Sequence, residues 1–229
     1  MFEVNSPISV VPKIGPKYQA ALEKLGIFTV EDLLYHFPSR YQDFTKIKHI
    51  NELKDGDVVT VKAILGSVQN IFTKNRKRIT RAKVLDHTGE LDIIWFNQHY
   101  IKNSLETGKT YNISGKIGTF DRKICFISPE MEPASDVFSN KKSDTIHTGR
   151  LVPIYPETYG VSSKWLRSKI NFLLNSETDL KEFLPQEILK EKNFTEINKA
   201  LNIVHFPNTI GESEGCKKRF AFEELFIEL

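Results

Sequence analysis

The chain has 229 residues, of which 40% are hydrophobic and 27% are charged, and its formal net charge is +3. This composition is typical of a soluble globular protein that is long enough to hold one to three small domains. The sequence contains neither an apolar run long enough to cross a bilayer nor a secretion signal, so we expect a cytoplasmic protein without a membrane partner. Two widely separated cysteines argue against a disulfide framework and fit a reducing compartment.

Residues 1–56 are predicted to form an N-terminal helical segment. A helix should begin at Pro16, because proline in the first helical position loses no hydrogen bond. Thr29 should cap a second helix, with Asp32 three residues later as its partner, and Pro38 should end that helix.

The start of the first helix carries a candidate DNA-backbone hairpin. Lys13, Gly15 and Lys17 resemble the hairpin of a helix-hairpin-helix motif, which binds phosphates through amide groups at a helix start. The motif has glycine on both sides of an apolar residue, and here the first glycine is replaced by Lys13. A purely structural pair of helices is therefore the alternative interpretation.

Residues 57–128 are predicted to form a five-stranded barrel of the OB-fold class. Alternating or apolar segments predict strands, and Gly, Asp and Thr-Gly positions predict the turns between them. A short helix should separate the third strand from the fourth, as in OB-folds, whose loops after the first and fourth strands bind oligomers. The expected strands are 59–65, 79–85, 90–96, 110–118 and 123–128, the helix is 97–106, and the two binding loops are 71–78 and 119–122.

The rest of the chain is predicted to be a linker and a mostly helical connector. Residues 129–149 hold prolines, serines and charges that offer little to bury, so they are expected to form the linker. Residues 150–229 form the connector, and the whole chain is therefore expected to have an α+β fold. Within the connector we expect an extended segment at 151–156, a helix capped by Ser162 or Ser163, and helices at 179–192, 194–202 and 213–229, the last without a stop signal, as in a piece of a longer protein.

Positive charge is concentrated in the predicted barrel. Residues 57–128 hold twelve basic and six acidic side chains, whereas residues 129–229 hold thirteen basic and sixteen acidic ones. A run of like charges is usually just a solvated face of the protein. These basic side chains repel one another, however, and a bound polyanion would relieve that repulsion, so we expect contacts to a DNA backbone here. The candidate backbone-binding residues are Lys74, Arg76, Lys77, Arg78, Arg81, Lys83, Arg122 and Lys123.

Two aromatic residues beside the basic cluster are candidates for stacking on bases. Side chains alternate along the third strand, so Phe96 should share a face with Asp92 and Ile94 and meet water. Tyr100 should point to the flank of the short helix, while Ile101 and Leu105 face the core. The alternative is that Phe96 folds back onto the barrel rim and that Tyr100 is an ordinary exposed tyrosine.

The sequence contains no arrangement typical of catalysis. It has no phosphate-binding loop of the nucleotide-hydrolysing type and no nucleophile paired with a base. Its six histidines have no metal-ligand spacing on one element, and Cys125 is expected to be a small buried hydrophobe. We therefore expect no catalytic residues, no metal, no cofactor and no enzyme activity in this chain by itself.

Several stretches in order along the chain resemble the N-terminal portion of RecG, the bacterial ATP-dependent DNA helicase. Any one of them would be a weak signal, but the set and its order are specific to that family. The stretches are Ile14-Gly15-Pro16-Lys17, residues 32–41, Phe96-Asn97-Gln98-His99-Tyr100, residues 151–156, His205-Phe206-Pro207 and residues 219–225.

The resemblance implies that the barrel is the wedge domain, which docks on replication forks and Holliday junctions during DNA recombination and repair. Residues matching Phe96 and Tyr100 would stack on bases where the template strands part. ATP and magnesium are implied only for a motor outside this sequence. The expected partners are branched DNA, single-stranded DNA and, as a candidate, a single-stranded-DNA-binding protein, with the chain acting as a monomer. One departure is Lys13, where the hairpin motif has glycine. The other is Trp95, at a position where an apolar or aromatic residue is usual.

Two other functions compete with a DNA-binding wedge. An OB-fold can also serve as a protein-interaction module, which here would bind a replication partner through an apolar groove and have little affinity for DNA. A complete enzyme is the weakest of the three hypotheses, because no catalytic constellation supports it.

Overall fold

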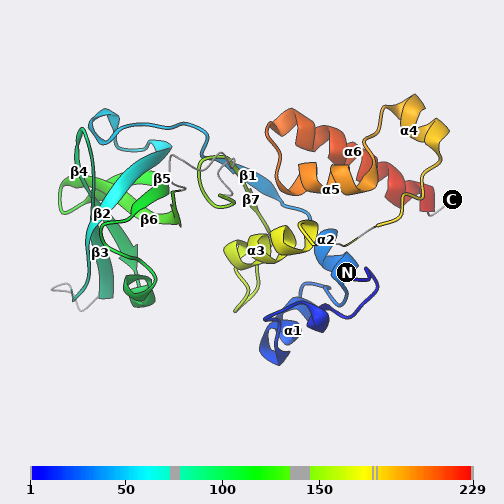
Figure 1. Cartoon of the computed structure of the whole chain (residues 1–229), viewed down its shortest axis with the longest axis horizontal. Coiled ribbons are helices and arrows are strands. Elements are labelled where there is room, and N and C mark those ends of the chain that lie inside the picture. The colour runs from blue at the N-terminus through cyan, green and yellow to red at the C-terminus, as the bar shows by residue number, and fades with distance from the viewer. Residues whose placement is uncertain (1, 73–77, 135–144, 177, 179, 228–229) are drawn as a thin grey trace. The chain divides into compact units, whose positions relative to one another are not determined.

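The computed structural model describes residues 2–72, 78–134, 145–176, 178 and 180–227. The chain divides into two compact units, which we call the barrel unit (Asp43–Arg150) and the helical unit (Met1–Gln42 with Leu151–Leu229) (Figure 1). The sequence analysis treated residues 1–56 and 150–229 as separate segments, whereas here the two ends of the chain share one hydrophobic core.

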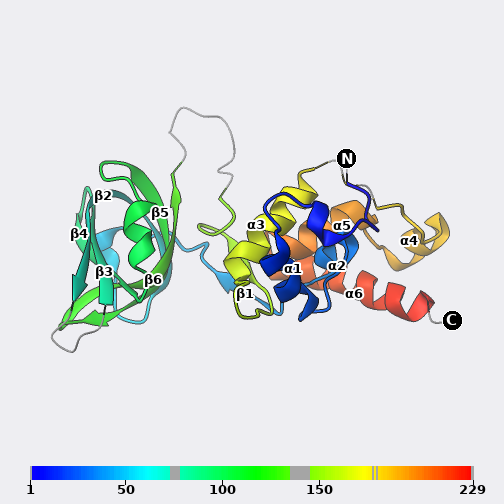
Figure 2. The same cartoon turned by 90° about the horizontal axis from the view of Figure 1, so that it is seen from below.

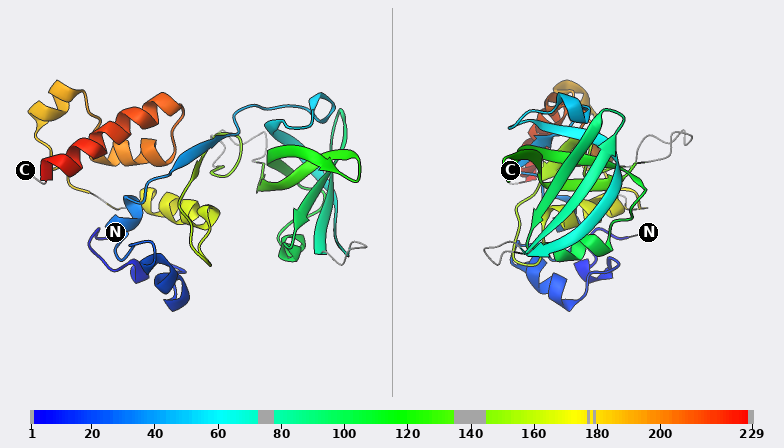
Figure 3. Two further views of the ribbon diagram at one scale, coloured as in Figure 1. Left: turned by 180° about the vertical axis from the view of Figure 1, so that it is seen from behind. Right: turned by 90° about the vertical axis from the view of Figure 1, so that its left-hand side faces the viewer.

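The barrel unit is a closed barrel of five strands in the order β2-β3-β4-β6-β5. Its strands face the viewer in the right-hand view of Figure 3. All neighbours pair antiparallel except β4 and β6, whose parallel pairing closes the barrel. The predicted α+β fold with a five-stranded OB-like barrel is confirmed. The strands are β2 (Val58–Phe72), β3 (Arg78–Asp86), β4 (Gly89–Phe96), β5 (Thr110–Phe120) and β6 (Lys123–Pro133); the 3₁₀ helices are η2 (Ile50–Glu52) before the barrel and η3 (His99–Asn103) in place of the longer predicted helix.

Alternation along the strands forms the barrel core. Every second residue of β2 from Val59 to Leu65 is buried, as the sequence pattern predicted. Trp95 fills the interior from β4, and its indole N–H donates to the carbonyl of Pro129 over 3.2 Å, so its polar atom is satisfied.

The last strand of the barrel extends into the predicted linker. Residues 129–149 were expected to lie outside any strand, but β6 continues to Pro133. The carboxylate of Glu132 then accepts hydrogen bonds from the backbone N–H groups of Ile146 and His147 and from the Thr148 hydroxyl. The described parts of this segment are therefore anchored to the barrel, because strand pairing and a carboxylate supply the partners that composition alone did not reveal.

The described part of the helical unit consists mainly of α-helices (Figure 2). Thr29 and Asp32 form the predicted capping box, and Ser162 is the N-cap of the helix that begins at Ser163. The fourth helix begins seven residues later than predicted, because residues 180–185 are irregular. The elements are η1 (Ile8–Val10), α1 (Pro16–Glu23), α2 (Val30–Leu34), α3 (Ser163–Leu174), α4 (Gln186–Lys192), α5 (Ile197–His205) and α6 (Ile210–Ile227).

A small two-stranded sheet pairs distant parts of the chain. Strand β1 (Arg40–Asp43) pairs with β7 (Leu151–Ile154), so the predicted helical segment 1–56 contains a strand that was not expected, while the extended conformation at 151–154 is confirmed. Among the described residues, no helix is long and apolar enough to span a membrane.

A fully buried histidine links both ends of the chain in the helical unit. The Nε2–H of His205 donates to the carbonyl of Leu34 over 2.7 Å, and its Nδ1 accepts from the hydroxyl of Tyr155 over 2.9 Å. The carbonyl of Leu34 can only accept, so Nε2 carries a proton, and a neutral ring in that tautomer accepts from Tyr155 at Nδ1. Burial lowers the pKa of His205 from 6.5 to about 4.

A methyl group added at Gly115 should destabilise the barrel. It would lie 2.9 Å from Cβ and 3.0 Å from Cα of Pro129, where the backbone cannot give way. We expect Gly115→Ala to lower the free energy of unfolding by about 1–3 kcal/mol. The change in the free energy of unfolding is measured by urea denaturation, with the fluorescence of Trp95 as the signal in a Trp165→Phe background.

Gly89→Ala is the matched control in the same barrel. Its methyl would meet Ile50 at an ordinary contact distance of 3.5 Å, so little change is expected. Equal stability of the two variants would contradict the close approach of β5 and β6.

His205 should remain neutral in the folded protein well below the usual histidine pKa. The His205 ring takes up a proton near pH 6.5 in the unfolded chain and near pH 4 in the folded chain. Its contribution to the free energy of unfolding therefore falls as the pH drops from 6.5 to 4, by about 3 kcal/mol in total. Burial raises the pKa of Glu223 to about 6, which has the opposite effect on stability, so the ring must be observed directly.

An NMR titration of the His205 ring makes that observation. Its resonances should not move between pH 8 and pH 5.5 in the folded protein, and should titrate near pH 6.5 in urea. A native midpoint near 6.5 would contradict the buried hydrogen-bonded ring.

Candidate nucleic-acid interface

Phe96 ends β4 at one edge of the barrel and is partly open to solvent. It lies opposite Ile79 of β3, and its side chain is 39% exposed. Its ring meets the ring of Phe120 edge to face, with centroids 6.1 Å apart. Phe96 is thus neither inside the barrel nor free of it, because one edge rests on an aromatic neighbour while another faces water.

A small apolar cluster on the outer surface of the barrel supports Phe96. The sequence predicted that the face shared by Asp92, Ile94 and Phe96 would meet water, but Ile94 is only 1% exposed. The reason is tertiary, because side chains of β3, β5 and β6 cover this face of β4. We call this group the outer cluster; it consists of Ile79, Ile94 and Cys125 with Ile71, Phe120 and Ile127 packed against them.

Tyr100 lies on η3 and is 62% exposed. Its hydroxyl donates to the side-chain oxygen of Gln98 over 3.3 Å. Ile101 and Leu105 pack against the barrel core, as predicted from their spacing. The short helix therefore presents the tyrosine ring to solvent while its other side is fixed.

Two of the predicted phosphate-binding side chains are engaged by acids of the neighbouring strand. Arg81 is 2.6 Å from Asp92 and Lys83 is 2.8 Å from Glu90, both diagonal pairs between β3 and β4. The sequence around Arg81 and Lys83 contains no acidic residue, but the pairing of β3 with β4 places Asp92 and Glu90 beside them. The hydrogen bond to Asp92 raises the pKa of Arg81.

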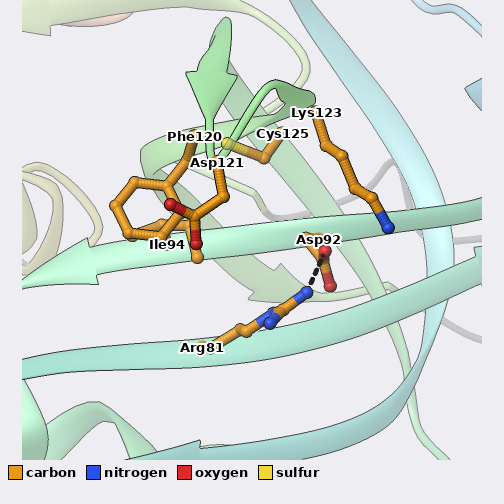
Figure 4. A pocket seen from close by; sticks show the side chains of 7 residues that line it. All are labelled: Arg81, Asp92, Ile94, Phe120, Asp121, Lys123 and Cys125. Atoms are coloured by element: carbon orange, nitrogen blue, oxygen red, sulfur yellow. Dashed lines mark hydrogen bonds and ion pairs between the residues drawn. The ribbon is translucent and has the colours of Figure 1, made fainter. Parts of the chain in front are cut away.

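The turn between β5 and β6 presents the other predicted cations. Asp121 and Arg122 both have positive φ, of 49° and 63°, which matches the twist of a two-residue hairpin turn. Arg122 and Lys123 are exposed, and within the described part of the chain neither is in an ion pair. Figure 4 shows Lys123 at a hollow of about 190 Å³, together with the Arg81–Asp92 pair.

The remaining predicted cations lie in the sequence between the end of β2 and the start of β3. Lys74, Arg76 and Lys77 fall outside the described residues. Arg78 is exposed, and its guanidinium carbon is 5.4 Å from the centroid of the Phe72 ring.

The N-terminal hairpin candidate lies in the helical unit. Lys13 has a φ of 65°, the left-handed conformation that glycine adopts most readily, so a local turn forms without the expected glycine. Gly15 is the N-cap of α1, and Lys13 and Lys17 are both exposed.

Comparison with known proteins decides the family. The family model described as the RecG wedge domain matches residues 7–175. An ATP-dependent DNA helicase RecG of Thermotoga maritima is 31% identical over 98% of this chain and 28% of its own length; one from Streptococcus pneumoniae is 32% identical over 97% and 31%. A solved structure of RecG bound to a three-way DNA junction matches 97% of this chain and 30% of that chain, with 31% identity and a TM-score of 0.77.

The chain belongs to the RecG family. It spans less than a third of the length of the curated RecG relatives cited here, and what it matches is the wedge-containing N-terminal portion. The resemblance recognised from the sequence is therefore confirmed.

The RecG wedge barrel also holds a cluster that histidine spacing alone did not reveal. His49, Asp86 and His87 bring one ligand atom each within 4.8 Å of one another, although they come from η2's N-cap and the β3–β4 turn. Burial alone would raise the pKa of Asp86, but hydrogen bonds from Thr88, Ile50 and Gly89 lower it to about 2. These four bonds hold the turn, which is a sufficient structural role for the carboxylate.

A large hollow in the helical unit is a poor match for a polyanion. It measures about 1260 Å³ and is lined by rings such as Tyr35 and Phe220. Its charged lining is mainly acidic, and an anionic ligand would be repelled. The acids are Glu3, Glu31, Asp32, Glu223 and Glu224, against the cations Lys181 and Lys217.

Sequence reasoning missed Phe120, whose ring helps to cover Cys125 and supports Phe96. Its position within the predicted binding loop 119–122 was the available signal. Burial raises the pKa of Cys125 to about 11, so the thiol should be almost inert at pH 8.

Phe120→Ala should therefore make Cys125 reactive. Removing the ring opens the outer cluster to water and relieves the burial that raises the pKa, so we expect alkylation at pH 8 to become at least tenfold faster. Mass spectrometry of the alkylated peptides measures it. Cys216, buried in the helical unit, is an internal control whose rate should not change; equal acceleration at both cysteines would indicate general unfolding instead.

Proposed function

We propose that this chain is the branched-DNA-binding wedge of a RecG-type helicase. The observation that carries the proposal is the half-exposed ring of Phe96, braced by Phe120 on a rigid apolar base at the edge of a basic barrel. A ring held in this way can stack on a base without losing much conformational entropy of its own. The wedge positions and splits the junction, and parts of the protein outside this sequence supply the ATP-driven advance.

The energies of stacking and pairing are consistent with this division of labour. Separating one base-pair step costs about 1.4 kcal/mol on average. Stacking one base on an aromatic side chain is worth about 1–3 kcal/mol. Phe96 and Tyr100 can therefore hold open one or two pairs at a junction, but they must release each base to receive the next. Continuous separation needs work from a motor.

The exposed cations suit contacts to the phosphate backbone. Arg122 and Lys123 on the β5–β6 turn flank the outer cluster, and no acid pairs with them among the described residues. Arg81 and Lys83 contribute less than the sequence implied, because a phosphate would have to compete with Asp92 and Glu90. Among the described residues, binding should then depend mainly on Arg122, Lys123 and Arg78.

A relative bound to DNA supports branched DNA as the ligand. The RecG structure that matches 97% of this chain was solved with a three-way DNA junction. The OB-like barrel found here is a fold whose loops often bind single strands.

Replacing both rings should reduce the preference for forks more than the affinity for DNA in general. For the wild-type chain we expect tighter binding to a fork than to linear duplex. If about five phosphates are neutralised, log affinity should fall with log salt at a slope of roughly −3.5 to −4.5. Phe96→Ala with Tyr100→Ala should lower the fork-to-duplex ratio at least about fivefold, the lower limit for losing one stacked base. Fluorescence anisotropy with labelled oligonucleotides measures both quantities.

Two controls separate the ring effect from charge and from folding. Arg122→Ala should weaken binding to every DNA and flatten the salt slope by about 0.7–0.9, without changing the fork preference. Tyr159→Ala removes a more exposed ring in the helical unit and should change nothing. Equal affinity of the wild-type chain for fork and plain duplex would count decisively against a wedge and favour a protein-interaction module.

A further inference from the structure

The β2–β3 ribbon has two faces, and they carry different side chains. Ile71 pairs with Ile79, which in turn lies opposite Phe96, so these residues share the face of the outer cluster. Phe72 pairs with Arg78 one position further on, so both point to the opposite face. The last described rung of the ribbon therefore presents a ring and a guanidinium on the side away from Phe96.

Phe72 is the most exposed phenylalanine among the described residues, at 69%. A single exposed apolar residue is ordinary. This one differs because the guanidinium of Arg78 lies 5.4 Å from its ring centroid. The cation lies against the ring and leaves much of it open to solvent, so the ring keeps a face available for stacking.

Polar contacts place η3 on the same face of the ribbon as Phe72. Asn70 and Thr80 form the rung two positions from the Phe72–Arg78 rung, on the same face, and their side chains are hydrogen-bonded over 2.8 Å. The amide of Asn70 donates to the carbonyl of His99, and the hydroxyl of Thr80 donates to the carbonyl of Gln98. Phe72 lies about 6–7 Å along the strand from Asn70. Tyr100 follows His99 directly, so its helix adjoins this face.

We propose that Phe72 and Arg78 form a second stacking site, which takes an unpaired nucleotide of single-stranded DNA on the face of the ribbon opposite Phe96. An aromatic ring binds the face of any base, and an adjacent arginine stacks on it or binds its phosphate, so the site is tolerant of sequence. The inference rests on the proposed function and extends it. The barrel edge then has base-binding rings on both sides, one for each strand that leaves a junction.

Removing the ring of Phe72 should affect only DNA that offers unpaired bases. For a fork with single-stranded arms, Phe72→Ala should weaken binding at least about fivefold, the lower limit for one stacked base. For a three-way junction whose arms are all duplex, the affinity should stay within about twofold of the wild type. Anisotropy titrations of the full chain at one salt concentration measure both.

Phe72→Leu tests whether the ring itself is needed. Leucine keeps an apolar side chain but cannot stack, so it should lose as much affinity as alanine. Phe28→Ala is the matched control, because Phe28 is also highly exposed, at 58%, but lies in the helical unit. It should bind both DNAs like the wild type.

The outcomes separate this inference from the function on which it rests. Unchanged affinity of Phe72→Ala, wild-type binding by Phe72→Leu, or equal weakening on both DNAs would overturn the second site. In those cases a fork preference that still depends on Phe96 and Tyr100 would leave the wedge intact. If the wild-type chain shows no fork preference, the wedge proposal itself fails. Circular dichroism of each variant confirms that it is folded.

Discussion

The parallel pairing of β4 with β6 is the interaction on which the candidate interface depends. It closes the barrel, and it carries the β5–β6 turn to the outer side of β4, where Phe120 meets Phe96. Without this pairing, Ile94 and Cys125 would face water and Phe96 would end an unsupported strand. An aromatic ring that stacks on bases gains affinity when its position is fixed in advance, and the outer cluster provides that support.

Strand pairing, more than the order of residues in the sequence, decides which basic side chains of this barrel have an acidic partner. Arg81 and Lys83 belong to a run without acids, yet both are neutralised diagonally by β4. Of the predicted DNA-binding cations that the structure describes, those without an acidic partner lie at the turn carrying Arg122 and Lys123 and at the last described rung of the β2–β3 ribbon. Turns and ribbon ends are also where the aromatic rings are exposed, so phosphate and base contacts can be made together.

The two faces of the ribbon give the interface a physical logic. Alternation along a strand sends successive side chains to opposite sides, so the ribbon directs Ile71 and Ile79 toward Phe96 and the outer cluster, and Phe72 with Arg78 to the opposite face. An edge with rings on both sides would fit between two separating strands. The helical unit, by contrast, lines a large hollow mainly with acids.

The sequence by itself determined the OB-like barrel, the capped helices at Thr29 and Ser162, the burial of Cys125 and the family, because these depend on alternation, capping chemistry and local motifs. It also pointed to Phe96 and Tyr100. The tertiary structure alone decided that β1 pairs with β7, that Ile94 is covered, that Arg81 is paired, and that Phe120 braces Phe96. Each of these joins residues that are distant along the chain or on different strands, and local patterns carry no record of which surfaces will meet.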